Sequence, residues 1–292
     1  MDFTGVNKEE WTESLQEFLE EPKLWKEVFD VMYTSTKTFH MPYFDQGTAT
    51  SYNRGSQYTR SVPESVDDIM VINDSAILPY FIDRADLAQN GYIDEVEMAR
   101  EQGIALDEQM QRQIFTDIHA NATDFDDGNM GGTGGTAITV TGGAAGNIGD
   151  LFRKARTAIA SSKGGLKALN SKKLMAIVPP EIYEHAVSYA QANGFQFADT
   201  SLESGKVPVI NGFKIYESNL LDTTTDSGSV HCIFGVNKAM KLGILNTTFG
   251  QVVTVDDPDN RSGVGVTSRV DYGVKLRNND KEHVLDVLVA TS

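Results

Sequence analysis

Residues 47–60 read Gly-Thr-Ala-Thr-Ser-Tyr-Asn-Arg-Gly-Ser-Gln-Tyr-Thr-Arg, a polar stretch rich in glycine, threonine and tyrosine. A short apolar run, Ile69–Ile72, follows it, and a long amphipathic segment comes later in the chain. So polar a stretch cannot bury enough apolar surface to pack a core by itself. It must lie on another surface, and no neighbouring segment offers an obvious platform. We therefore expect a subunit that reaches onto its neighbours and serves assembly rather than catalysis.

Residues 39–76 have the pattern of a long two-stranded excursion. Threonine and tyrosine suit a pleated ribbon that faces solvent, and the return strand is expected at about residues 66–72. The segment is mildly basic within an acidic chain. Its basic residues, which outnumber the acidic ones between positions 33 and 66, are Lys37, Arg54 and Arg60. We expect this basic loop to dock on the acidic face of a helix in a neighbouring subunit.

The long amphipathic segment, residues 94–122, predicts a helix about 42 Å long at 1.5 Å per residue. Its apolar stripe repeats at i+4 steps, as a helix packed on a core requires, and consists of Leu106, Met110, Ile114 and Ile118. The opposite face is acidic and includes Glu97, Glu101 and Glu108. These acidic residues are the predicted partners of the basic loop.

Two short amphipathic helices are predicted at residues 7–32, with Pro22 between them. Both tryptophans of the chain, Trp11 and Trp25, fall on their apolar faces. Helices this short are marginal in water without a surface to pack on. The rings are therefore expected to dock either on the chain's own core or partly on a neighbouring subunit.

A glycine-rich join at residues 128–149 leads into a region of alternating helix and strand patterns. The patterns predict helices at about 147–162 and 181–193, a strand at 174–178, and a hairpin whose type I′ turn is Asn211-Gly212. Strand patterns return at 230–236, 251–255, 264–276 and 283–290. We interpret residues 146–226 as an α/β insertion between two parts of one sheet-containing domain, in an α+β fold.

Composition excludes several classes of protein. The net charge of −16 among 292 residues argues against a grip on nucleic acid, which needs lysine and arginine at the phosphates. No apolar run approaches the length of a membrane span, and the acidic amphipathic N-terminus does not resemble a signal peptide. The single cysteine, Cys232, excludes an internal disulfide.

Searches for catalytic or ligand motifs give no reaction to propose. The glycines of 132–137 match a dinucleotide loop in spacing, but a helix precedes them and a strand pattern follows. Asp124, Asp126 and Asp127 fit a helix exit better than a calcium loop, because position 12 of such a loop would be Gly135. Turn chemistry also suffices for Asp256 and its neighbours. No cofactor and no metal are expected.

The order of these segments resembles the major capsid proteins of tailed bacteriophages, which have the HK97-like fold. Val178-Pro-Pro-Glu-Ile-Tyr183 and Gly212-Phe-Lys-Ile-Tyr-Glu-Ser-Asn219 are similar to phrases common in that family. The resemblance covers nearly the whole chain. It implies an N-terminal arm (1–32), an extended β-hairpin loop (33–78), a discontinuous peripheral domain (79–145 and 227–292) with a spine helix at 94–122, and an inserted axial α/β domain (146–226).

The resemblance also implies a function and a set of partners. Hexamers and pentamers of the chain would close into an icosahedral shell around double-stranded DNA, assembled in the host cytoplasm as part of the virion. A portal, a separate scaffolding protein and possibly a decoration protein would be the other partners. Because the loop tip has arginines but no lysine, no Lys–Asn cross-link between subunits is expected. The inter-subunit contacts expected are Lys37, Arg54, Arg60, Glu97, Glu101, Glu108, Trp11 and Trp25.

Two alternatives remain open at this stage. An encapsulin-like compartment would use the same fold to enclose a cargo protein instead of DNA. A soluble α+β enzyme would require some of Asp256, His231 and His119 to converge in one pocket, although these residues lie on different predicted elements.

Overall fold

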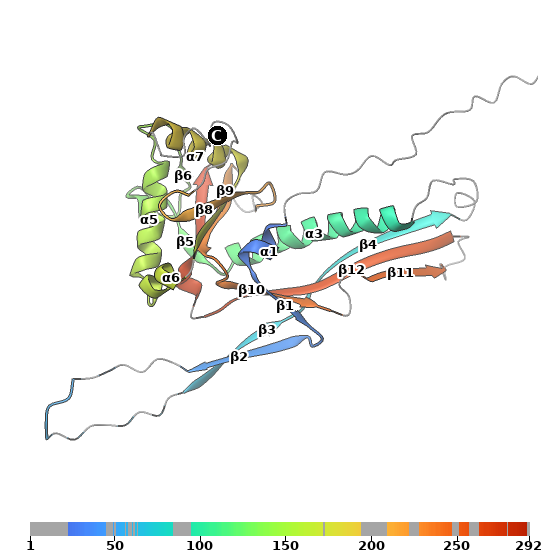
Figure 1. Cartoon of the computed structure of the whole chain (residues 1–292), viewed down its shortest axis with the longest axis horizontal. Helices are drawn as coiled ribbons and strands as arrows, with labels where there is room; N and C mark the ends of the chain where they lie inside the picture. Colours follow the sequence, from blue (N-terminus) through green and yellow to red (C-terminus); the bar gives the residue numbers. More distant parts are fainter. Residues whose placement is uncertain are drawn as a thin grey trace, which may run out of the picture.

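The computed structural model describes residues 23–44, 49, 51–55, 57, 60, 62, 64–83, 95–171, 173–193, 209–221, 228–246, 251–256, 263–278 and 280–290. Within these ranges only the backbone is described for 82–83, 95–99, 251–256, 263, 264 and 266. The described strands form two mixed sheets and a separate two-stranded hairpin. Figure 1 shows one sheet in a rounded region with several helices, the other in an elongated region, and the hairpin projecting from the body.

The elongated region is organised by one long strand, β12 (Gly263–Leu276). The other strands of this sheet are β1 (Asp30–Thr34), β4 (Asp74–Asp83), β10 (Met240–Leu245) and β11 (Gln251–Asp256). β4 pairs with β12 along one edge, and β11 and β10 pair in turn with the two halves of its other edge. β1 then pairs with β10 in parallel, so a segment from near the N-terminus closes the sheet.

The long helix α3 (Glu95–His119) lies along β4 and β12 (Figure 1). Its described apolar stripe is buried as predicted, since Met110 and Ile114 have no exposed area and Leu106 and Ile118 are also in the core. The predicted long helix is therefore confirmed, with its end at His119 rather than residue 122. At 1.5 Å per residue its 25 residues span about 38 Å.

The second sheet follows the order β5-β13-β9-β7-β8, with β6 also paired to β13. Its strands are β5 (Thr123–Phe125), β6 (Ile138–Thr139), β7 (Leu174–Val178), β8 (Phe213–Glu217), β9 (Ser229–Val236) and β13 (Val284–Ala290). The remaining short elements of this rounded region are α4 (Asp127–Met130), α6 (Gly165–Ser171) and the 3-10 turn η1 (Lys281–His283).

Aromatic packing joins the second sheet to its helix α5 (Ile148–Ser161), and the helix α7 (Pro180–Ala192) adds Ile182 and Ala186 to the same core. Phe152 of α5 stacks on Phe234 of β9 with ring centroids 5.0 Å apart, and Phe213 of β8 completes the cluster. Such ring pairs stabilise by about 0.5–1.5 kcal/mol beyond the area that they bury. Helices and strands are thus held in one core.

The sheets correct one sequence-based boundary. Residues 146–226 were expected to form an insertion distinct from the returning strands, but β9 and β13 from the C-terminal region pair into the same sheet as β7 and β8. Only β10, β11 and β12 of the returning strands belong to the elongated region. Pairing between distant strands, which no local pattern encodes, decides this membership.

Two local predictions also need correction. The helix expected to reach Met32 ends at Val28 as α1 (Leu24–Val28), and β1 begins two residues later. The Asn211-Gly212 turn has the predicted positive φ angles of 49° and 91°. However, β8, which follows the turn, pairs in parallel with β7. The one pairing described for the strand predicted before the turn is the isolated bridge from Ile210 to Phe213.

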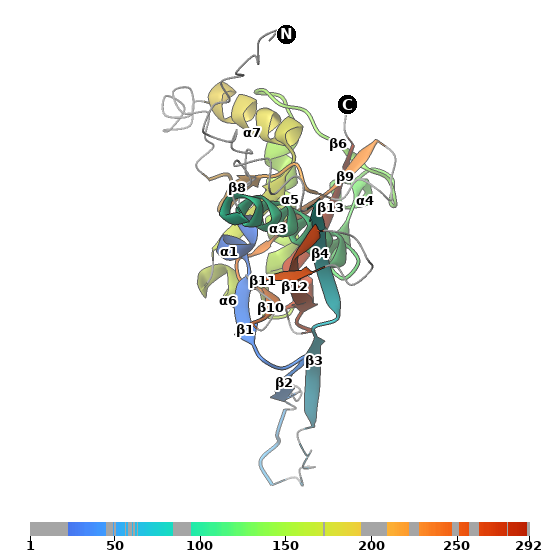
Figure 2. The same cartoon turned by 90° about the vertical axis from the view of Figure 1, so that its right-hand side faces the viewer.

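The predicted two-stranded excursion is confirmed as the antiparallel hairpin of β2 (Thr38–Phe44) and β3 (Ser65–Val71). It extends away from the body in both views (Figures 1 and 2). Its base crosses the elongated sheet where Gly243 of β10 is paired with Gly273 of β12. A Cβ at Gly273 would lie 2.3 Å from the Val71 carbonyl oxygen, and one at Gly243 would lie 2.6 Å from the Met70 methyl carbon. At position 273 only glycine permits this close approach of backbone, whereas at position 243 the flexible end of the Met70 side chain would have to move.

Gly273→Ala should destabilise the chain by about 1–3 kcal/mol, because a methyl group there must displace backbone rather than a flexible side chain. Gly103→Ala is the matched control, since Gly103 lies within α3 with nothing near its Cβ position. The control should stabilise the chain by up to about 1 kcal/mol through helix propensity. Urea unfolding of the unassembled subunit measures both, and equal effects of the two substitutions would contradict the close approach.

Candidate assembly surfaces

The projecting hairpin exposes apolar residues and buries a charged one. Along β3, Ile69 and Val71 are 42% and 48% exposed, whereas Asp68 and Met70 are buried. Phe44 at the end of β2 is 72% exposed. A two-stranded hairpin is at best marginally stable alone in water, and these exposed apolar side chains add surface that gains from being buried. The hairpin is therefore built to be covered by another surface.

The buried carboxylate fixes the direction in which the hairpin points. Asp68 Oδ1 forms an ion pair of 3.0 Å with Lys275 Nζ, and Asp68 Oδ2 accepts a 3.0 Å hydrogen bond from the Asn278 backbone N–H. The Lys37 carbonyl accepts a further hydrogen bond of 2.8 Å from the Ile72 N–H. A buried charge is tolerated when it is paired and hydrogen-bonded in this way. These contacts tie both strands and the sheet together at the hairpin base.

A second exposed apolar surface lies on β4. Ile77 is 57% exposed and Phe81 is 42% exposed, and both alternate with Ala76 and Leu78, which pack into the core. Because side chains alternate across a strand, Ile77 and Phe81 lie on the face away from α3. The elongated region therefore has exposed apolar side chains on β4 as well as on the hairpin.

The structure places the predicted contact residues in different settings. Lys37, Arg54 and Arg60 are exposed on or beside the hairpin. Glu101 and Glu108 are half-buried on α3, and the backbone of Glu97 lies in its first turn. Trp11 lies outside the described residues. The basic groups thus lie on or beside the hairpin and the acidic ones on α3.

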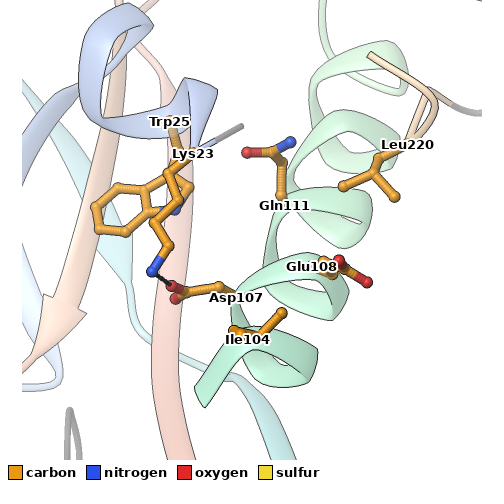
Figure 3. Close-up of a pocket in the computed structure, with 7 residues that line it drawn as sticks. All are labelled: Lys23, Trp25, Ile104, Asp107, Glu108, Gln111 and Leu220. Carbon is orange, nitrogen blue, oxygen red and sulfur yellow. Dashed lines mark ion pairs between the residues drawn. The ribbon is translucent and has the colours of Figure 1, made fainter. Parts of the chain in front are cut away.

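Trp25 is not available to a neighbouring subunit, because its side chain has no exposed area. Figure 3 shows it beside Lys23, where α1 packs against α3. Lys23 Nζ lies 2.7 Å from Asp107 Oδ2, and the Leu24 N–H donates to Gln111 Oε1 at 3.1 Å. The predicted inter-subunit role of Trp25 is therefore wrong, and the alternative of docking on the chain's own core is correct for this helix.

The hollow between α1 and α3 is too small for a ligand. Its cavity of about 10 Å³ is lined by residues that include Glu108, Ile104 and Leu220 (Figure 3). A single water molecule needs about 10–15 Å³. The hollow is a seam between packed helices, and Glu108 borders it.

The aspartates after α3 were predicted to form a helix exit, but Asp124 lies in β5 and Asp126 stands at the start of α4. Asp126 caps α4 by accepting from the Asn129 N–H and also accepts from the Gly135 N–H at 2.5 Å. These backbone donors, Gly135 first, lower the pKa of the Asp126 carboxyl. The oxygens that a cation would need are thus used by backbone N–H groups.

Two carboxyl groups are held in an unfavourable setting between α3, β4 and β12. Burial raises the pKa of Asp74. Burial also raises the pKa of Asp117, with a smaller contribution from the charge of Asp74, while the hydrogen bond from Gln113 Nε2 lowers it. The Tyr272 pKa is raised by burial and then by both carboxylates.

Three side chains from separate elements converge near the end of α3. His119 Nδ1 lies 2.8 Å from Asp286 Oδ2, and His231 Nδ1 lies 2.9 Å from the same oxygen. No pattern in the sequence indicates this convergence, and His119 and His231 were expected to meet only if the chain were an enzyme. The side chain of Asp256 is outside the described set. Cys232 points to the opposite face of β9, where burial, and secondarily the Asp286 charge, raise the pKa of its thiol.

Comparison with known proteins identifies the family to which the chain belongs. The family model described as phage capsid protein matches residues 68–287, which is more than half of the chain. The chain belongs to the phage capsid protein family. This capsid protein is thus a structural component of a virion shell, as the resemblance implied. No curated protein sequence matches it.

Solved structures share the fold of this capsid protein at low sequence identity. One from Mycobacterium phage Che8 has a TM-score of 0.71 at 17% identity and covers 99% of this chain and 98% of its own. One from Gordonia phage Cozz has a TM-score of 0.71 at 13% identity, covering 98% and 92%. The capsid of an empty GTA particle has a TM-score of 0.69 at 11% identity, covering 100% and 99%. The predicted α+β class and HK97-like fold are therefore confirmed.

The exposed apolar residues of the hairpin and β4 were missed as site residues. A usable signal was present in β3, where Asp67-Asp68-Ile69-Met70-Val71 places apolar residues on both faces of one strand. A two-sided apolar strand at the base of a polar loop indicates that both faces will be covered. None of the helices among the described residues is long and apolar enough to cross a membrane.

Asp117→Asn should raise the stability of the capsid subunit at neutral pH and flatten its pH dependence. A carboxyl whose folded-state pKa is raised contributes most below the pKa of the unfolded chain, and this contribution is lost as pH rises through the folded-state value. The amide keeps an oxygen for the Gln113 hydrogen bond. Urea unfolding between about pH 4 and 8 tests this.

Glu184→Gln, at an exposed carboxyl on α7, is the matched control and should leave the pH profile nearly unchanged. An Asp117→Asn profile parallel to that of the unaltered chain would show that burial of this carboxyl carries no cost.

Proposed function

We propose that this capsid protein assembles with itself, as hexamers and pentamers, into a closed icosahedral shell that encloses double-stranded DNA. The observation that carries the proposal is the projecting hairpin, which exposes Phe44, Ile69 and Val71 while its base is fixed to the sheet. A rigid arm with uncovered apolar residues suits a docking role on another copy of the chain. Because the arm points away from its own body (Figure 2), the surface that covers it comes from a neighbour.

A division of labour within the subunit supports this proposal. The elongated sheet with α3 would form the peripheral domain of the subunit, and β2–β3 would be the extended loop. The second sheet with α5 and α7 would form the axial domain, which meets its copies around the five-fold and six-fold axes. Residues 1–22 would extend the N-terminal arm of which α1 is the described end.

The partners that we expect are the enclosed DNA and the other proteins that take part in building the shell. With a net charge of −16 the subunit would enclose DNA without sequence-specific contacts, because it lacks the excess of cations that neutralises phosphates. We expect a portal, a separate scaffolding protein and a decoration protein as further partners. Assembly would take place in the host cytoplasm, and the role is structural, without catalysis.

Electron microscopy of the purified chain, with its size-exclusion profile, tests the proposal. Closed particles tens of nanometres across are expected, and their ultraviolet absorbance would separate nucleic acid from an encapsulin-like protein cargo. If the chain alone stays small, co-expression with the scaffolding protein is the second arm. A compact monomer under both conditions would contradict self-assembly.

Arg54→Glu combined with Arg60→Glu should impair shell formation while the subunit stays folded. Each exposed ion pair contributes only about 0.2–1 kcal/mol, but the shell repeats the contact in every subunit. Particle yield by sedimentation, with circular dichroism for the fold, measures the effect, which should be larger at low salt.

The lysine version, Arg54→Lys with Arg60→Lys, is the matched control and should assemble normally because charge is kept. Adding Glu97→Arg and Glu101→Arg to the double glutamate variant should restore some of the yield if the acidic face of α3 is the partner. Normal shells from the double glutamate variant would remove the charge-docking idea and leave the apolar contacts alone.

A further inference from the structure

Three potential metal ligands meet where α3 ends against the second sheet. His119 is the last residue of α3, His231 lies in β9, and Asp286 lies in β13. One ligand atom from each lies within 4.8 Å of the others. The register explains the meeting of the two strand residues, because His231 pairs with Leu288, two positions from Asp286 on the same face. The two imidazole rings are 3.6 Å apart between centroids.

The carboxylate at the centre needs a positive partner. Asp286 is 5% exposed at its side chain, and a buried carboxylate is costly unless a cation or several donors compensate it. Both imidazole Nδ1 atoms approach one oxygen, Oδ2. The other oxygen, Oδ1, is buried and has no hydrogen-bond partner among the described residues. If the two neutral rings only donated hydrogen bonds, both bonds would go to Oδ2, and Oδ1 would be left without a donor.

We propose that His119, His231 and Asp286 bind one divalent transition-metal ion, for which Zn²⁺ is the best match. Imidazole nitrogen and carboxylate oxygen are the ligands of zinc sites, at about 2.0–2.2 Å from the ion. A tetrahedral ion with such bonds separates neighbouring ligand atoms by roughly 3.3–3.5 Å. The distances of 2.8 and 2.9 Å to Oδ2 need to open by only a few tenths of an ångström.

The setting of the site favours a cation in two further ways. The C-terminal end of a helix carries a partial negative charge, and His119 stands at this end of the 25-residue α3. Its side chain is 22% exposed, so solvent reaches the site from the helix side and a water molecule completes the four ligands. Cys232, although next to His231, lies on the other face of β9 and does not contribute a ligand.

Bound metal would join the end of α3 to two strands of the second sheet. Because α3 belongs to the elongated region and β9 and β13 to the rounded one, the ion would stiffen the junction between them. This inference concerns the single subunit and does not depend on the proposed shell.

Metal uptake by the full-length, untagged chain tests the proposal. After treatment with a chelator and dialysis against Zn²⁺, the protein should retain one zinc per chain by elemental analysis. Saturating Zn²⁺ should raise the unfolding midpoint by roughly 5 °C or more, since the ion binds only the folded state. His119→Gln should weaken zinc binding more than about 100-fold, because even outer-shell partners carry about 10- to 100-fold.

His40→Gln is the matched control. His40 Nδ1 also contacts a carboxylate, Asp67 Oδ2 at 2.5 Å, but it is exposed and has no second imidazole at that carboxylate among the described contacts. This variant should retain zinc as the unaltered chain does.

A spectroscopic measurement keeps the test independent of how the variants fold. Co²⁺ in place of zinc should give the intense visible bands of a four-coordinate site in the unaltered chain, and zinc should displace them. Absence of retained zinc in the unaltered chain would overturn the proposal, as would equal zinc affinity of a folded His119→Gln variant.

Discussion

The shape of the subunit depends on how closely one backbone can approach another at the base of the hairpin. Gly243 and Gly273 face each other across β10 and β12, and the chain from Met70 to Ile72 lies directly on them. Gly273 lets the hairpin backbone at Val71 lie against the sheet, and Gly243 leaves room for the Met70 side chain. Asp68 then meets Lys275 and Asn278, and the hairpin acquires one fixed direction. Every surface that the arm offers to another molecule is placed by this contact.

The long helix α3 and the long strand β12 also help to make the subunit rigid. α3 spans the elongated region and is held by α1 through Gln111 and Asp107. At its C-terminal end His119 meets the second sheet at Asp286. The partly buried setting of Asp74 and Asp117 is the electrostatic cost of packing this helix so tightly on β4 and β12.

Local patterns in the sequence predicted individual helices and strands well, but they did not predict which strands lie side by side in a sheet. The i+4 stripe from Leu106 to Ile118 determined the long helix, and the apolar run 174–178 determined β7 to the residue. β10 was missed because Gly243 and Lys241 interrupt its apolar pattern, although the glycine is what the hairpin needs. β4 was missed because Pro79 is unusual in a strand and is tolerated here at the edge of the sheet.

The sequence also did not predict contacts between distant residues. The sheet to which β9 and β13 belong, and the meeting of His119 with His231, depend on contacts between residues more than 50 positions apart. Periodicity carries no information about such contacts.

The apolar character of the exposed hairpin bears on how temperature acts on the particle. Burial of residues such as Phe44 and Val71 gains its free energy mainly from water released from apolar surface, and this gain weakens on cooling. Contacts of this kind loosen in the cold and tighten on warming, in contrast to hydrogen bonds and ion pairs. A shell held by them would come apart most readily near freezing, and its subunits would be best kept separate on ice and joined by warming.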